Sequence, residues 1–262
     1  MRSLVGFALT QLNAALFGIA MLALIVGTFA LYPAHAALPR YDFLFICAVL
    51  IQIAMIASGL ETWPEARVIL AFHIAGTVME LFKTSAGSWV YPEANFVRLM
   101  GVPLFSGFMY AAVGSYIARS WRLHDFKFER YPPFWLTLIL GLLAYVNFFA
   151  HHFVWDMRWA LTAATITIFA RTWLDFSPVP TAAVRWRLPL LVPFVGLAGL
   201  IYVAENIATF GRAWVYPNQT DGWQTVSPTK FGSWFLLMLV SWALVSAVRR
   251  STLANTRSNR NA

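Results

Sequence analysis

The sequence predicts an all-α membrane protein, a polytopic bundle of about eight transmembrane helices in two parallel four-helix repeats. Of its 262 residues, 60% are hydrophobic and 11% are charged, whereas an ordinary soluble domain carries roughly 25% charged residues. Apolar runs of about 20 residues, the length that crosses a bilayer, recur from one end of the chain to the other. A short aromatic motif also occurs twice at a fixed distance from a glutamate.

Eight apolar segments are expected to cross the membrane, with prolines in the loops between them. They are residues 9–31, 41–60, 66–86, 99–118, 133–151, 155–174, 188–208 and 230–248. The single cysteine, Cys47, lies inside the second segment, which excludes a disulfide scaffold. The net charge of +8 comes without a motif that reads a nucleic acid groove, so we expect no nucleic acid partner. Membrane lipids are the expected partners.

The basic residues predict the orientation in the membrane. Eight crossings place both termini on one side, and that side receives 13 of the 19 Lys and Arg residues, against 6 on the other. Because basic residues concentrate in cytoplasmic segments, both termini are expected to be cytoplasmic. Residues 251–262 form a polar, basic tail suited to anionic headgroups.

An internal repeat is predicted at an offset of 125 residues. Glu80 precedes Trp89-Val90-Tyr91-Pro92, and Glu205 precedes Trp214-Val215-Tyr216-Pro217 at the same offset. Eleven identities fall in the 55 aligned positions from Pro64 to Ala118. We therefore expect two fused halves, residues 1–125 and 126–250, which are parallel because each crosses the membrane an even number of times. Alternatively, the motif is interfacial aromatic sequence that arose twice.

Polar side chains form a stripe along one face of segment 66–86. His73, Thr77, Glu80 and Thr84 follow each other at helical spacing. An ionisable group at membrane depth is costly and usually marks a functional site. Lys83, one turn after Glu80, is expected to pair with it.

A second stripe follows in segment 188–208 and contains Tyr202, Glu205 and Thr209, with Asn206 alongside. Because Ala208 occupies the position equivalent to Lys83, Glu205 needs another partner, and Arg212 is a candidate.

The short turn between segments 133–151 and 155–174 is the third concentration of polar residues. It contains His151, His152, Asp156 and Arg158. With the two glutamates, these residues could carry acid/base or ligand-binding chemistry, hold a metal, or form a structural ion network. Metal-ligand patterns such as H-x-x-H are absent, so no metal site is predicted, and the sequence identifies no cofactor.

The predicted chemistry is biased toward the outer side of the membrane. The candidate catalytic residues are Glu80, Lys83, His151, His152, Asp156, Arg158 and Glu205, and the candidate binding residues are His73, Trp89, Tyr91, Tyr202, Asn206, Trp214 and Tyr216. The inner half is expected to hold few ionisable groups. This asymmetry favours an enzyme or receptor over a transporter of charged solutes, which needs a polar route to both faces.

The segment from Glu80 to Glu93, ELFKTSAGSWVYPE, and the segment from Gly101 to Tyr110, GVPLFSGFMY, resemble the YoaT-like family of bacterial integral membrane proteins. The resemblance covers nearly the whole chain. It implies a location in the bacterial inner membrane and no known reaction.

A fainter similarity runs to membrane carotenoid hydratases and lycopene cyclases, through Glu80, Gly87, Tyr91 and the Gly101–Leu104 stretch. The spacing differs. The Pro-x-Glu-Glu of the cyclases is also missing, because Pro103 is followed by Leu-Phe-Ser.

Three functions remain open on the sequence. The first is an enzyme or binding protein for a lipid or isoprenoid, with Glu80 and Glu205 as acid/base groups. The second is a small-molecule transporter that uses the pseudo-symmetric glutamates as coupling sites. The third is a structural or accessory subunit. The sequence does not indicate an oligomeric state.

Overall fold

The computed structural model describes residues 2–180 and 182–249, and most of these residues are helical. The helices are α1 (Arg2–Ala14), α2 (Leu16–Leu31), α3 (Arg40–Ala57), α4 (Trp63–Ser85), α5 (Phe105–Leu123), α6 (Phe134–Ala150), α7 (Arg158–Phe169), α8 (Leu191–Phe210), the 3-10 helix η1 (Pro217–Gln219) and α9 (Lys230–Val248). The strands are β1 (Arg98–Leu99), β2 (Val102–Pro103), β3 (Lys127–Glu129), β4 (Trp173–Phe176) and β5 (Trp186–Pro189). The predicted tail, residues 251–262, lies outside the described residues.

Among the described residues, α3, α4, α8 and α9 are long and apolar enough to cross a membrane, and the pair α1 and α2, bent by 66° at Ala15, makes a fifth candidate. These helices identify a membrane protein. Each of the eight expected segments contains a helix, but α6 has only 17 residues and α7 only 12. At 1.5 Å per residue α7 is about 18 Å long, shorter than the hydrocarbon core.

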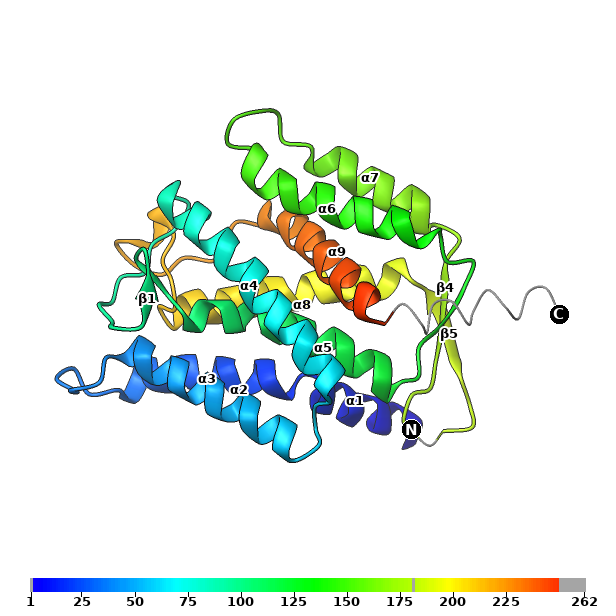
Figure 1. Cartoon of the computed structure of the whole chain (residues 1–262), viewed down its shortest axis with the longest axis horizontal. Helices are drawn as coiled ribbons and strands as arrows, with labels where there is room; N and C mark the ends of the chain where they lie inside the picture. Colours follow the sequence, from blue (N-terminus) through cyan, green and yellow to red (C-terminus); the bar gives the residue numbers. More distant parts are fainter. Residues whose placement is uncertain (1, 181, 250–262) are drawn as a thin grey trace.

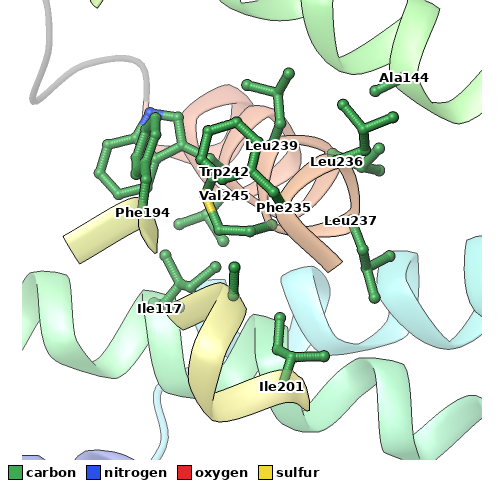
Figure 2. Close-up of a cluster of buried hydrophobic side chains, with 14 of the residues drawn as sticks. Ile117, Ala144, Phe194, Ile201, Phe235, Leu236, Leu237, Leu239, Trp242 and Val245 are labelled. Atoms are coloured by element: carbon green, nitrogen blue, oxygen red, sulfur yellow. The ribbon is translucent and has the colours of Figure 1, made fainter. Parts of the chain in front are cut away.

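Helix α9 lies at the centre of the molecule. It crosses between α4 and α5 on one side and α6 on the other (Figure 1). Its side chains pack in several directions, toward Ala144 of α6, Ile117 of α5 and Phe194 and Ile201 of α8 (Figure 2). Because α9 is apolar on all sides, it is the most buried of the candidate spans.

The two ends of the bundle differ in structure. The start of α1 and the end of α9 lie at the same end as β4 and β5, and β1 lies at the opposite end (Figure 1). We call these the terminal end and the loop end. At the terminal end, Arg122 and Arg249 pair with Glu65 at 2.8 and 3.0 Å, and at the loop end Arg40 pairs with Glu93 at 2.6 Å.

The terminal end corrects one expectation. The all-α prediction misses a three-stranded antiparallel sheet of order β3-β4-β5. In β3 and β4, buried side chains alternate with less buried ones: Phe128 is buried in β3, and Leu174 and Phe176 are buried in β4. The sequence also predicted few ionisable groups in the inner half of the membrane; at the terminal end, Glu61, Glu65 and Arg119 are among the buried residues.

Small residues let the central helices approach closely. A Cβ added at Gly114 of α5 would meet the Phe72 ring of α4 at 2.6 Å, and one added at Gly141 of α6 would overlap Ala243 of α9. Small residues at helix contacts are the usual device for close packing in membranes, where lipid chains are as apolar as the side chains.

Some helix bounds of the described residues match at an offset of 125 residues. Helix α5 spans 105–123 and α9 spans 230–248, and α4 and α8 end at residues 85 and 210, so these bounds differ by 125. Corresponding contacts also recur: α2 packs against α3, α5 and α8, and α6 packs against α7, α9 and α4.

The close contact of α6 with α9 gives a stability prediction. Gly141→Ala would place a methyl group against the Ala243 Cβ, which has no rotamer to escape, and we expect a loss of about 1–3 kcal/mol. Gly27→Ala is the control, because nothing lies within 4 Å of an added Cβ there. Thermal unfolding in one detergent measures both variants, and equal melting temperatures would contradict this packing.

Candidate functional site

An apolar cavity of about 260 Å³ lies between the two halves of the chain, at the loop end and toward the middle of the bundle. Both glutamates of the repeat, Glu80 and Glu205, line it. Its other walls come from α2, α5, α8 and α9 and from the loops after α4 and α8. A cavity of about 150 Å³ accommodates benzene, so this one has room for part of a hydrophobic ligand.

Three neutral donors surround the Glu80 carboxyl group. Trp89 Nε1 donates to Oε2 at 2.8 Å, Tyr91 Oη donates to Oε2 at 2.6 Å, and Tyr110 Oη donates to Oε1 at 2.6 Å. Burial and the nearby Glu80 raise the pKa of the Tyr91 hydroxyl well above its usual value. The hydroxyl therefore keeps its proton and acts as a donor.

Glu205 has a similar environment with a partly different set of donors. Tyr216, the counterpart of Tyr91, donates to Oε1, and Trp234 of α9 donates to Oε2 at 2.5 Å. Burial and Glu205 raise the pKa of Tyr216 well above its usual value, so it is also held as a donor.

A pair of backbone hydrogen bonds joins the two motifs. The Val90 and Val215 amides donate to each other's carbonyl oxygens at 3.0 and 2.9 Å in an isolated antiparallel bridge. These residues are themselves related by the 125-residue offset, so the reciprocal pair has the arrangement that a two-fold axis requires. The Trp89 and Tyr216 rings meet beside it with centroids 5.9 Å apart. The bridge brings Tyr91 and Tyr216 to the same cavity.

Two expected ion pairs do not form. Lys83 does not pair with Glu80 and instead lies near His151 Nε2 at 3.3 Å and His152 Nε2 at 3.0 Å. Arg212 does not reach Glu205, and its carbonyl oxygen instead accepts hydrogen bonds from Arg40 and Tyr41. The prediction of ion pairs considered only charged residues at helical spacing. In the structure, tryptophan and tyrosine side chains from the loops donate to the two glutamates instead.

The turn between α6 and α7 is held by a polar cluster beside the cavity. Asp156 accepts hydrogen bonds from Asn147 Nδ2 at 3.0 Å and from the Arg158 amide at 2.9 Å, and it pairs with the Arg158 guanidinium at 2.9 Å. Arg158 also donates to the Thr229 carbonyl at 3.1 Å, which ties the turn to the start of α9.

Of the predicted binding residues, Trp89, Tyr91, Trp214 and Tyr216 line the cavity. The other three lie elsewhere. His73 packs on Phe108 with ring centroids 4.6 Å apart, in the contact between α4 and α5. Tyr202 donates to the Val226 carbonyl, and the Asn206 side chain accepts from the Val226 amide. Tyr202 and Asn206 therefore fasten the loop between α8 and α9.

Sequence reasoning missed three residues of this region. Tyr110 and Trp234 complete the two carboxyl environments, and the Lys230 ammonium lies 4.5 Å from the Tyr216 ring centroid and 5.7 Å from that of Trp89. Tyr110 lies in α5, one turn after Gly107, and Trp234 lies in α9, a few residues after Pro228. Because Tyr110 and Trp234 are 124 residues apart, the 125-residue offset does not align them, and no signal in the sequence indicates either of them.

Within residues 2–180 and 182–249, no group of three or more His, Cys, Asp or Glu side chains is placed to hold a metal ion. The site comprises two carboxyl groups, their tyrosine and tryptophan donors and the neighbouring basic cluster.

Comparison with known proteins places the chain in a family. The model of a family described as "Protein of unknown function (DUF817)" matches residues 3–242. The chain belongs to this family. It is also 45% identical over 213 residues to the "Uncharacterized protein YoaT" of Bacillus subtilis (strain 168), a match that covers 81% of this chain and 80% of that protein. The resemblance seen in the sequence is thus confirmed. No solved structure matches the chain.

The Asp156 cluster gives a pH prediction. Burial opposes its charge, but the bonds from Asn147 and Arg158 prevail and lower the pKa of Asp156 below its usual value. A lowered folded-state pKa contributes stability above the unfolded-state pKa of about 3.9, and this stability is lost as the pH falls through the folded-state value.

Asp156→Asn is therefore expected to be less stable than the wild type at pH 7, with a difference that shrinks below about pH 4. Thermal unfolding followed by tryptophan fluorescence from pH 7 to 3 measures it. A difference that is independent of pH would be inconsistent with the ion pair.

Proposed function

We propose that the protein is an enzyme of the bacterial inner membrane that binds a lipid or isoprenoid in the cavity and moves protons with Glu80 and Glu205. The observation that carries this proposal is that both carboxyl groups line one apolar cavity. General acid/base catalysis on a hydrophobic substrate needs such a combination, with positioned proton donors and acceptors in a site shielded from water.

The hydrogen-bond partners of the two carboxyl groups support a chemical role. Among the described residues, neither Glu80 nor Glu205 has a Lys or Arg nitrogen within ion-pair distance. A buried charge is costly unless it is balanced. Each group must therefore hold a proton or balance a positive charge, including the positive charge that develops on a substrate during a reaction.

Other residues receive supporting roles in this proposal. Tyr91 and Tyr216 orient the carboxyl groups, Trp89 and Trp214 close the cavity at the loop end, and the cluster around Lys83 and Arg158 stabilises charge or relays protons. His151, His152 and Asp156 belong to this cluster.

Part of the cavity wall is exposed at the outer surface of the bundle, between α2 and α8. Ile19 of α2 and Leu200 of α8 line the cavity and are 42% and 56% exposed at the surface of the bundle. In a membrane this surface contacts lipid chains, so a hydrophobic molecule can enter between α2 and α8 without crossing water.

The proposal includes the finer architecture. Eight crossings in two parallel halves, residues 1–125 and 126–250, are supported by the matching helix bounds and by the reciprocal Val90 and Val215 bridge. Both termini are cytoplasmic in this arrangement, since the terminal end holds Arg67, Arg119, Arg122, Lys127, Arg130, Arg171, Arg185, Arg187 and Arg249, and the loop end holds six basic residues.

A transporter is the second candidate, favoured by a hydrogen-bonded chain that leads from the cavity toward the terminal end. Tyr116, which lines the cavity, donates to Gln11 Oε1 at 2.6 Å, and Gln11 Nε2 lies 3.1 Å from His124 Nε2. His124 Nδ1 donates to the Ser177 carbonyl at 2.7 Å. Such a polar route would serve a transporter that couples flux to the two glutamates.

The enzyme proposal predicts a change in membrane lipids. Cells that express the wild type are expected to accumulate or deplete a lipid or isoprenoid species, and Glu80→Gln and Glu205→Gln are expected to abolish that change while the proteins remain folded. Glu129→Gln, in the distant β3, is the control and should behave as the wild type. Mass spectrometry of lipid extracts measures the effect. Full activity of folded Glu80→Gln would refute the acid/base role.

The orientation predicts which loops are reached from outside the cell. In a Cys47→Ala background, a membrane-impermeant maleimide should label Asn218→Cys at the loop end in intact cells and should label Ala183→Cys only after lysis. Both positions are exposed. The reverse pattern would overturn the topology, and labelling of a cysteine at Tyr116 from the cytoplasmic side would favour the transporter.

A further inference from the structure

Lys83 is a buried cation without a carboxylate partner. Lys83 is 6% exposed, and among the described residues its ammonium group lies within hydrogen-bond distance of the Nε2 atoms of His151 and His152. None of the ion pairs among the described residues includes Lys83. A buried charge is normally paired with an opposite charge. We therefore expect a bound anion beside Lys83.

Two further cations lie within electrostatic range of Lys83. Arg158 and Lys230 both act on it, and Asp156, already paired with Arg158, is the nearby negative charge. Lys230 lies over the Tyr216 and Trp89 rings. Glu205 also attracts Lys230. The cluster thus holds three basic groups, while the nearby carboxyl groups are Asp156, which is paired with Arg158, and Glu205, which acts on Lys230.

The two histidines are neutral acceptors that an oxyanion can replace at Lys83. His151 Nδ1 donates to the Asn147 carbonyl at 2.9 Å, so its Nε2 lone pair faces Lys83. Burial, and then the positive Lys83, lower the pKa of His152. An incoming oxyanion would take the place of the imidazole lone pairs as the acceptor for Lys83. His152 is exposed, which leaves this side of the cluster open.

The neighbouring turn places the cluster at the depth of lipid headgroups. Phe153, Trp155 and Trp159 are 78%, 92% and 74% exposed beside it. Exposed aromatic residues of this kind concentrate at the interface between membrane and water. The anions most abundant at that level are the phosphates of lipid headgroups, and soluble phosphate reaches it from the aqueous side.

We propose that Lys83 and Lys230 bind a phosphate-type oxyanion, either on a lipid headgroup or free in solution, in the place where His151 and His152 now accept from Lys83. Basic groups bind phosphate by charge-assisted hydrogen bonds, and a lysine ammonium serves as a point charge for it. The site does not depend on what the cavity binds or on the acid/base role of the glutamates. Its test therefore stands apart from that of the proposed function.

The experiment has two arms with the full-length protein. In the first, thermal unfolding in a zwitterionic detergent is followed against inorganic phosphate at constant ionic strength set with chloride. In the second, native mass spectrometry counts the lipids retained from nanodiscs of phosphatidylglycerol or phosphatidylcholine. Saturable stabilisation by phosphate assigns a soluble anion, and selective retention of phosphatidylglycerol alone assigns a headgroup.

Lys83→Gln and Lys230→Gln are each expected to weaken the binding seen in the wild type by about tenfold or more, because each removes a charge that the oxyanion would pair with. Arg98→Gln is the matched control, since Arg98 is an exposed arginine at the same end and outside the cluster. Should Lys83→Gln fail to fold, Lys230→Gln decides the question. Absence of saturable binding in both arms, or equal binding by wild type and both lysine variants, would overturn the proposal.

Discussion

A carboxyl group inside a membrane protein is stable only when its polar atoms are satisfied and its charge is accounted for. In this protein two such groups, Glu80 and Glu205, lie on the walls of one apolar cavity, and neutral tyrosine and tryptophan donors satisfy both of them. The donors come from the loops after α4 and α8 and from α5 and α9. The glutamates therefore dictate how four helices and two loops must meet.

The other contacts of the fold hold these helices and loops in place. Helix α9 is apolar on every side and fills the centre, so the other helices pack around it (Figure 2). The Val90 and Val215 bridge ties the two loops together at the point where the halves meet. Beside it, the turn between α6 and α7 is tied to α9 through Arg158 and brings two histidines to Lys83. Two buried carboxyl groups, an apolar cavity and a basic cluster thus lie next to each other at the loop end.

The sequence predicted the parts that depend on local pattern. Apolar periodicity located a helix in every expected segment, and the 125-residue offset selected Glu80, Glu205 and the four aromatic residues that line the cavity with them. The prediction from the sequence was wrong for contacts that depend on tertiary packing. The spacing of three residues suggested a Glu80 and Lys83 pair, but loop donors reach Glu80 first. The alternation of buried and less buried side chains in β3 and β4 covers only three and four residues, too few to predict a strand. Tyr110 and Trp234 carry no signal until α5 and α9 are placed.

The most direct test of this account is an experimental map of the protein in a lipid nanodisc. The account predicts that the Glu80 and Glu205 carboxyl groups face one cavity between α2, α5 and α8, with non-protein density of a hydrophobic ligand in it. A map in which packed side chains separate the two carboxyl groups, or in which they face different surfaces of the bundle, would contradict it.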